Sequence, residues 1–253
     1  MNHLRRNEIQ LYFAYPEQIT DSSLLRRYKS LLSDDELAQM PRYYFARHRH
    51  QYLVTRALIR SSLSNYYPVD PVAWRFDKNS FGKPQIGQPD KTLPIRFNLS
   101  HCDGMIVCGI VRDYDIGVDV EDSQRSTRAA LTSLSSYFST EEIEALEKLP
   151  TKLQKQRFFD YWTLKESYIK ARGMGLAIPL RKFSFKFHAD KLEGISIHPD
   201  LGDNADDWQF WRIPMDGRYR VAVAVSSGSS EFKLRAVKSV PLQSNDPIHL
   251  NFI

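Results

Sequence analysis

The 253-residue sequence lacks the features that mark several broad classes of protein. Its longest apolar run, Met105–Val111, is far shorter than the roughly 20 residues that span a membrane. No apolar stretch follows the basic first residues, as it would in a secretory signal. The nucleotide motifs Gly-x-x-x-x-Gly-Lys-Ser/Thr and Gly-x-Gly-x-x-Gly are absent as well. We therefore predict a cytoplasmic protein without a membrane partner.

Cysteine is scarce, with only Cys102 and Cys108 in the whole chain. If both lay in one strand, their offset would place them on the same face but about 20 Å apart, which is too far for a disulfide. Neither cysteine lies in a metal-ligand pattern, and Cys-x-x-Cys does not occur. The sequence therefore indicates a reducing compartment.

The excess of positive charge is small, +5 from 35 basic and 30 acidic residues, and 42% of the residues are apolar. This composition is typical of a globular protein and excludes a disordered chain. The basic residues are unevenly spread, because the segment from Arg42 to Arg60 holds five arginines and no acid. It is either a solvated helix face or a surface for phosphate, with Arg56 and Arg60 four apart on one helix.

The order of patterns predicts an α+β protein with two similar lobes. In the first half, a helix over residues 47–66 precedes a hairpin centred on Asp103-Gly104. In the second half, a helix over residues 153–171 precedes a similar hairpin centred on Asp216-Gly217. We predict lobes at 1–113 and 114–253, with a less ordered tail after about residue 226; chance similarity of two hairpins is the alternative.

One candidate site is the strand pattern Gly117-Val-Asp-Val-Glu121. The period of two places Asp119 and Glu121 on one face, with Val118 and Val120 on the other. Paired carboxylates suit Mg²⁺, which keeps waters and substrate phosphates in its remaining positions. An exposed polar strand face is the alternative interpretation.

A second pattern, Trp162-Thr-Leu-Lys-Glu-Ser-Tyr-Ile-Lys170, aligns Trp162, Glu166 and Lys170 along one helix face. A surface ion pair would explain Glu166 and Lys170, but burial beside the tryptophan would require further charged partners. A third pattern, Phe97-Asn-Leu-Ser-His101, ends a strand with a hydroxyl and an imidazole that can bind phosphate. A serine-hydrolase triad is excluded, since no partner acid stands at a readable spacing.

Together, in order and interval, the three patterns resemble the motifs of Sfp-type 4′-phosphopantetheinyl transferases. The resemblance extends from Arg42 to Val225 and includes the turn Phe81-Gly-Lys-Pro and the segment Gly173-Met-Gly-Leu. It implies a monomer built as a pseudo-dimer of two α/β lobes, with coenzyme A bound at an active site between the lobes. It also implies transfer of the phosphopantetheine arm to a serine of an apo acyl or peptidyl carrier protein domain, with release of adenosine 3′,5′-bisphosphate.

The resemblance implies roles for individual residues as well. It implies that Asp119, Glu121 and Glu166 are the ligands of Mg²⁺, with Mn²⁺ as an alternative ion. The phosphates of coenzyme A fall on Arg56, Lys83, Ser100, His101, Lys165 and Lys170. We assign catalysis to Glu166, as base for the serine directly or through water, and to Lys170, which would neutralise the leaving phosphate. Glu166 cannot easily be a tight metal ligand and a base at once.

Two other functions compete with this interpretation. The same phosphate ligands would serve an inactive coenzyme A or nucleotide-binding module, although such a module needs no base or metal. The positive charge also suggests nucleic-acid binding, but no aromatic residues interleave with the arginine-rich helix as a stacking platform. An acidic carrier domain would suit a basic, partly apolar surface, with candidate contacts at residues 124–128 and 137–146. Charge reversal at Arg125 and Arg128 should then raise KM for the carrier without changing KM for coenzyme A. The sequence does not identify the carrier.

Overall fold

The computed structural model describes residues 4–126, 134–250 and 252. Its α-helices are α1 (Ser22–Ser30), α2 (Asp34–Gln39), α3 (Ala46–Ser64), α5 (Leu134–Tyr137), α6 (Thr140–Glu147) and α7 (Thr151–Arg172). Its strands are β1 (Glu8–Ala14), β2 (Arg75–Lys78), β3 (Pro84–Gln88), β4 (Ile95–Cys102), β5 (Met105–Arg112), β6 (Ile116–Asp122), β7 (Phe183–His188), β8 (Lys191–Ile197), β9 (Trp208–Met215), β10 (Tyr219–Ser226), β11 (Lys233–Val240) and β12 (Ser244–Ile248).

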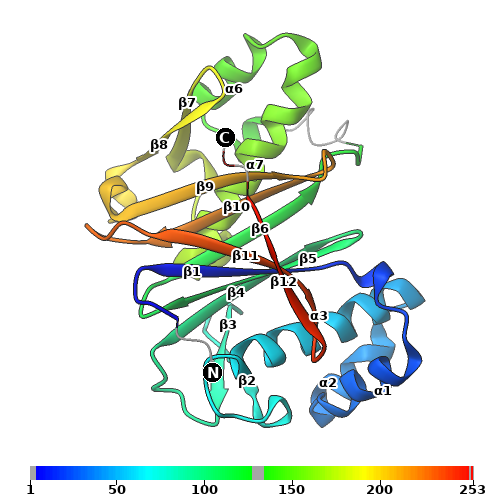
Figure 1. Cartoon of the computed structure of the whole chain (residues 1–253). Helices are drawn as coiled ribbons and strands as arrows, with labels where there is room; N and C mark the ends of the chain where they lie inside the picture. Colours follow the sequence, from blue (N-terminus) through cyan, green and yellow to red (C-terminus); the bar gives the residue numbers. More distant parts are fainter. Residues whose placement is uncertain (1–3, 127–133, 251, 253) are drawn as a thin grey trace.

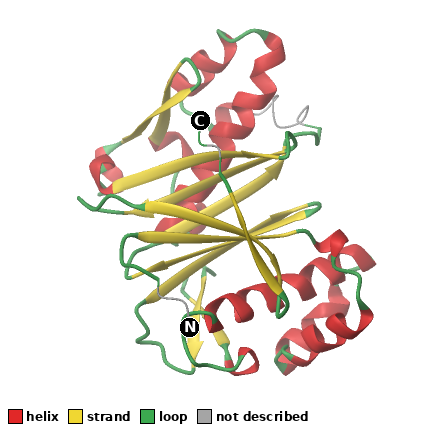
Figure 2. Cartoon of the chain, viewed as in Figure 1, coloured by secondary structure: helices red, strands yellow, loops and turns green. Residues whose placement is uncertain are grey.

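Two sheets lie face to face in the middle of the molecule, with helices outside them (Figures 1 and 2). One sheet has the order β12-β11-β1-β5-β4, and the other has the order β6-β10-β9. Helix α3 covers the outer face of the first sheet, and α7 covers the outer face of the second. The prediction of an α+β protein with two lobes is confirmed, since two facing sheets are each covered on the outside by one long helix.

Strand alternation creates the core between the two sheets. Leu11 and Val107 of the first sheet point inward, where they meet Val118, Val120 and Val223 of the second. The alternate residues of these strands point outward. In the first sheet Cys108 packs beneath α3, and in the second sheet Ala222 packs beneath α7. Because β6 follows the same alternation, Asp119 is turned toward α7, as its pattern predicts.

Helix α7 can approach β6 closely because residue 117 is a glycine. A Cβ atom on Gly117 would lie 1.9 Å from the carbonyl oxygen of Ser167 and 2.4 Å from the backbone nitrogen of Ala171. No side chain fits in that space, so glycine is required here. The close approach brings the Glu166–Lys170 segment of the helix beside the carboxylates of β6.

Local sequence signals correspond well to the observed elements. Ser33 and Ser139 each form a capping box with the glutamate three residues later, at the start of α2 and α6. The two Asp-Gly hairpins join β4 to β5 and β9 to β10, with Gly104 and Gly217 at positive φ. No helix in the described part of the chain is both long and apolar enough to cross a membrane.

The prediction of a less ordered tail after residue 226 is wrong. Strand β11 pairs in parallel with β1 along its length, from Glu8 opposite Lys233 to Phe13 opposite Lys238, and β12 pairs with β11. The end of the chain therefore returns to the sheet of the first lobe. The Ser-Ser-Gly-Ser-Ser segment, at residues 226–230, ends β10 and begins the short connection to β11.

The assumption that both cysteines lie in one strand is also wrong. Cys102 ends β4, whereas Cys108 lies inside β5, on the far side of the Asp103-Gly104 turn. Both thiols are free, and Cys108 is fully buried beneath α3. Burial raises the pKa of the Cys102 thiol to about 12, so it is protonated and unreactive at neutral pH.

Candidate functional site

The candidate site forms where β4, at the edge of one sheet, meets β6, at the edge of the other. Side chains rather than carbonyl groups join these two edges. The Asn98 Oδ1 accepts a hydrogen bond from the Val118 backbone N–H at 2.9 Å, and the Ser100 Oγ accepts one from the Val120 N–H at 3.3 Å. Both side chains are buried. They hold β6 beside β4 and fix the orientation of the carboxylates that β6 carries.

Ser100 also connects the charged groups of the site. Its hydroxyl donates to the Asp119 Oδ1 at 2.9 Å and accepts from the Lys170 Nζ at 2.9 Å. With the bond from Val120, the one donor and two acceptor positions of the hydroxyl are all used. In this arrangement Ser100 positions Asp119 and Lys170, and its hydroxyl has no hydrogen bond left for the phosphate that the resemblance implied.

The role of Asn98 leads to a testable expectation. Replacing Asn98 by Leu should leave the buried Val118 N–H without an acceptor, which costs about 1–3 kcal/mol of unfolding free energy, and transfer activity should fall because β6 shifts. Chemical denaturation measures the first effect. Arg96→Leu is the control, since Arg96 lies on the same strand with an exposed side chain. Equal stability of the two variants would contradict this role of Asn98.

Three carboxylates and one ammonium group meet at this junction. Asp119, which is 4% exposed, accepts a 2.6 Å ionic hydrogen bond from Lys170, while its Oδ2 is buried without a hydrogen-bond partner among the described residues. The Glu121 Oε1 accepts hydrogen bonds from the Trp162 Nε1 and from Arg125, each at 3.0 Å. Glu166 is half-buried on α7.

Asp119 and burial destabilise the charged forms of the two glutamates. Burial, followed by the charge of Asp119, raises the pKa of Glu121 to about 7. The same two causes, in the same order, raise the pKa of Glu166. A buried cluster of acids whose negative charges repel is stabilised by a bound cation.

The donor set can be compared with what a divalent metal requires. Among the described residues, no group of three His, Cys, Asp or Glu side chains is close enough together to hold a metal ion. Mg²⁺, however, is commonly bound by one or two carboxylates together with waters and substrate phosphates. The unpartnered Asp119 Oδ2 and the raised pKa values of Glu121 and Glu166 fit such a site.

Two hollows border the charged cluster. One, of about 260 Å³, is lined by Glu166, Lys170, Asn98 and the turn from Phe81 to Pro84. The other, of about 630 Å³, is lined by Glu121, Arg125, His101, Arg56 and the start of α3. The junction thus brings together Glu166, Lys170 and Lys83 on one side, and Glu121, His101 and Arg56 on the other.

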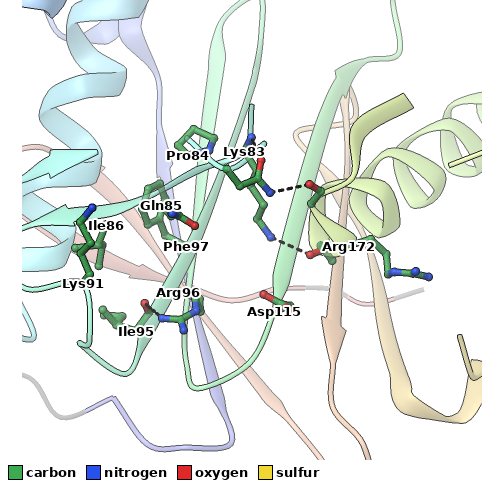
Figure 3. Close-up of a pocket in the computed structure, with 13 residues that line it drawn as sticks. Lys83, Pro84, Gln85, Ile86, Lys91, Ile95, Arg96, Phe97, Asp115 and Arg172 are labelled. Atoms are coloured by element: carbon green, nitrogen blue, oxygen red, sulfur yellow. Dashed lines mark hydrogen bonds between the residues drawn. The ribbon is translucent and has the colours of Figure 1, made fainter. Parts of the chain in front are cut away.

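Lys83 links the two lobes. Its Nζ donates to the carbonyl oxygens of Ile116, at 3.2 Å, and Ala171, at 2.9 Å. Figure 3 shows Lys83 reaching toward the end of the helix that carries Arg172, beside a further hollow of about 310 Å³. Burial lowers the pKa of Lys83. An ammonium group has three donors, so one remains for a ligand.

His101 and the arginines of α3 differ in accessibility. His101 is exposed, and its pKa is lowered, first by partial removal from water and then by the charge of Lys170. Arg56 lies 3.5 Å from Glu36 and packs on the ring of Tyr52. Arg60 is fully buried and paired with Glu36 at 2.5 Å. The two arginines therefore do not form the shared phosphate surface suggested by their spacing, although Arg56 still borders a hollow.

The structure contradicts the assignment of Lys165 as a phosphate ligand. Its side chain is 1% exposed, and its Nζ lies 2.8 Å from Glu142 and donates to the carbonyl oxygens of Leu180 and Phe183. Burial lowers the pKa of Lys165 and raises that of Glu142, while each group opposes the shift of the other. Lys165 is thus an internal charge of the second lobe.

Lys165→Met should destabilise the protein without changing coenzyme A binding. The variant leaves the Glu142 carboxylate buried and unpaired, which costs about 3–5 kcal/mol of unfolding free energy. The double variant Lys165→Met/Glu142→Gln should recover part of that loss, and Lys152→Met, an exposed lysine on the same helix, serves as the control. Undiminished stability together with weakened coenzyme A binding would restore the phosphate role.

Two contributors to the site were not assigned roles from sequence. Asn98 stands inside the Phe97–His101 motif, but its partner lies 20 residues further along the chain. Arg125 was considered only as a carrier contact, yet it pairs with Glu121 four residues earlier. The four-residue spacing of Glu121 and Arg125 could have indicated their ion pair from the sequence. The contact of Asn98 could not be found in this way, because it depends on how the strands meet in the fold. Arg128 lies outside the described residues.

Comparisons with known proteins agree with this arrangement. The family profile described as the 4′-phosphopantetheinyl transferase superfamily matches residues 115–224, and the profile of the N-terminal part of 4′-phosphopantetheinyl transferases matches residues 20–110. The 4′-phosphopantetheinyl transferase HetI of Nostoc sp. is 34% identical over 81% of this chain and 82% of its own length.

Two further relatives have a similar extent. The 4′-phosphopantetheinyl transferase Sfp of Bacillus subtilis is 29% identical, over 86% of this chain and 92% of its own. A phosphopantetheinyl transferase of Thraustochytrium sp. is 30% identical, over 81% of this chain and 74% of its own. Because these matches cover most of this chain and most of each relative, this chain belongs to the 4′-phosphopantetheinyl transferase superfamily.

Proposed function

We propose that this protein transfers the 4′-phosphopantetheine arm of coenzyme A to a serine hydroxyl of an apo acyl or peptidyl carrier protein domain, with release of adenosine 3′,5′-bisphosphate. The observation that carries the proposal is the cluster of Asp119, Glu121, Glu166 and Lys170 at the junction of the lobes, with a hollow on either side. Coenzyme A can reach both hollows, and the wider one, which extends to the start of α3, can also admit the carrier serine.

Asp119, Glu121 and Glu166 would hold Mg²⁺, with Mn²⁺ as an alternative ion. When bound, the ion supplies positive charge to the pyrophosphate oxygens as the phosphorus–oxygen bond breaks. Lys170 would contribute further positive charge at the leaving phosphate. Phosphoryl transfer depends mainly on positioning and on such charge stabilisation. This division of roles accounts for both the acids and the lysine of the cluster.

Glu166 is the proposed proton acceptor for the serine, directly or through a water molecule. Its pKa is raised by burial and by the charge of Asp119, which makes its carboxylate a stronger base than an exposed glutamate. Glu121, in contrast, is already held by Trp162 and Arg125. Glu166 is therefore better suited than Glu121 to accept a proton.

The phosphates of coenzyme A would be held by residues that border the hollows. Lys170 and the remaining donor of Lys83 face the pyrophosphate side, and His101 with Arg56 offers a site for the 3′-phosphate. His101 is neutral at pH 7 because its pKa is lowered, and an anionic phosphate would favour its protonated form. Lys165 has no part in this set.

An inactive coenzyme A-binding module is the second candidate function. Its phosphate ligands would be the same, but a module that only binds would gain nothing from a buried cluster of repelling acids. A cytoplasmic location and a monomeric state remain parts of the proposal, as does carrier contact along residues 137–146.

The proposal can be tested by mass spectrometry. The protein is incubated with coenzyme A, Mg²⁺ and a panel of apo carrier domains from fatty-acid, polyketide and nonribosomal-peptide synthases. We expect a gain of about 340 Da, the mass of the arm, on at least one carrier, and no gain when its serine is replaced by Ala or when Mg²⁺ is chelated. Binding of coenzyme A without any mass gain would support the inactive module instead.

A further inference from the structure

Two aromatic side chains at the start of α3 are exposed to solvent. Tyr44 is 86% exposed and Phe45 is 53% exposed. Their rings pack edge to face, with centroids 5.0 Å apart and an interplanar angle of 90°. Neither ring belongs to one of the buried cores. Adjacent aromatic residues that remain in water commonly mark a surface for a partner.

This aromatic pair, Tyr44 and Phe45, is held in place by the residues around it. The Arg49 guanidinium donates to the carbonyl oxygens of Tyr43 and Tyr44, both at 2.8 Å. The Arg47 guanidinium lies 5.7 Å from the centre of the Phe45 ring. A surface fixed in advance loses less conformational entropy on binding than a flexible one. The aromatic pair is therefore prepared for a protein contact.

The aromatic pair is next to the wider hollow of the site. Tyr43 and Arg47, its neighbours on either side, line the hollow of about 630 Å³. The same hollow is lined further in by His101 and Glu121. A partner seated on Tyr44 and Phe45 could thus extend a side chain along the hollow to the carboxylates. A ligand that has to deliver a serine needs such an approach.

The charge around the aromatic pair specifies the partner further. Arg42, Arg47 and Arg49 flank it in the sequence, and Arg47 lies 3.4 Å from Asp103. The arginines between residues 42 and 60 thus differ in burial: Arg60 is buried, whereas Arg42 and Arg47 are exposed to solvent. Apolar rings within a positive surface suit an acidic segment that also carries apolar side chains.

We propose that Tyr44 and Phe45 are the docking surface for the carrier domain, and that they receive an acidic segment of it that also carries apolar side chains. The inference rests on the proposed function, because it identifies the carrier as the partner. Coenzyme A is a poorer occupant, since an edge-to-face pair in open solvent offers no slot between parallel rings for its adenine. Residues 137–146 could contact the same carrier from the second lobe.

The test compares Tyr44→Ala/Phe45→Ala with Val72→Asp, which alters an exposed apolar residue away from the site. Binding of a fluorescently labelled apo carrier domain is measured by anisotropy without coenzyme A, and KM is measured separately for carrier and for coenzyme A. The aromatic variant should weaken carrier binding and raise KM for the carrier by about tenfold or more. Its KM for coenzyme A and its melting temperature should stay at the wild-type values, as should all values for Val72→Asp.

The possible outcomes separate this inference from the proposed function. Unchanged carrier affinity in the aromatic variant would overturn the docking surface even if transfer occurs. A rise in KM for coenzyme A alone would assign the aromatic pair to the nucleotide and also overturn it. If the wild-type protein modified no carrier, the proposed function would fail, while the anisotropy measurement would still report whether Tyr44 and Phe45 bind a carrier domain.

Discussion

Asp119→Asn should reduce phosphopantetheine transfer by at least about a thousandfold, because the charge stabilisation of a transferring phosphate is lost with a single group of this kind. The substitution preserves the shape of the side chain and its acceptor Oδ1, but removes the negative charge that faces Lys170. Asp119 is also the only acid of the cluster whose second oxygen is buried without a partner among the described residues. Steady-state kinetics with a carrier from the panel measures the loss.

A second readout separates loss of charge from loss of fold. Asp119 raises the pKa of both Glu121 and Glu166, so its neutralisation should lower both values, and that of Glu121 should fall below about 7. An NMR titration of the two glutamates reports this shift. Asp122→Asn is the matched control, a buried acid on the same strand that pairs with Arg218. Near-normal turnover of Asp119→Asn would remove Asp119 from the site.

Glu166→Gln should also reduce transfer by at least about a thousandfold, since one change removes both a proton acceptor and a candidate metal ligand. The melting temperature should not fall, because a half-buried carboxylate with a raised pKa is replaced by a neutral amide. Coenzyme A binding, measured by calorimetry without metal, should be retained.

Metal binding then distinguishes the two roles of Glu166. If Glu166 is a ligand, Mn²⁺ affinity measured by electron paramagnetic resonance falls in Glu166→Gln; if it acts only as the base, Mn²⁺ affinity stays the same while turnover is lost. Glu147→Gln, an exposed acid on α6 outside the proposed carrier contact, serves as the control. Substantial turnover by Glu166→Gln would contradict both roles.

The strand that carries Asp119 and Glu121 could be predicted from sequence alone. Alternation with Val118 and Val120 fixes which side chains face α7, because a strand has a period of two. The face of α7 was equally readable, since Trp162, Glu166 and Lys170 recur every four residues. Local periodicity therefore located all four charged groups of the cluster, together with the elements that position them.

For Lys165, helix geometry was a better guide to the position of the side chain than the family resemblance. Adjacent residues of a helix point about 100° apart, so a lysine next to Glu166 cannot share its face. The resemblance placed Lys165 at the phosphates, whereas the structure pairs it with Glu142 inside the second lobe. The helical spacing already indicated that Lys165 and Glu166 would have different surroundings.

The return of the chain to the first lobe could not be predicted from local signals. Strand β11 pairs with β1, and Glu8 meets Lys233 across 225 residues of sequence. The polar serine-rich segment before β11 resembles a disordered tail when read locally. The link between Asn98 and Val118 is of the same kind, because it exists only once two sheet edges have been brought together.

The central claim is that the cluster at the lobe junction transfers an intact phosphopantetheine arm. The most direct measurement quantifies holo carrier and adenosine 3′,5′-bisphosphate in the same reaction, for wild type and for Asp119→Asn. We predict equal molar amounts of the two products from the wild type and neither product from Asp119→Asn. Release of the nucleotide without holo carrier, or equal product formation by both proteins, would contradict the account.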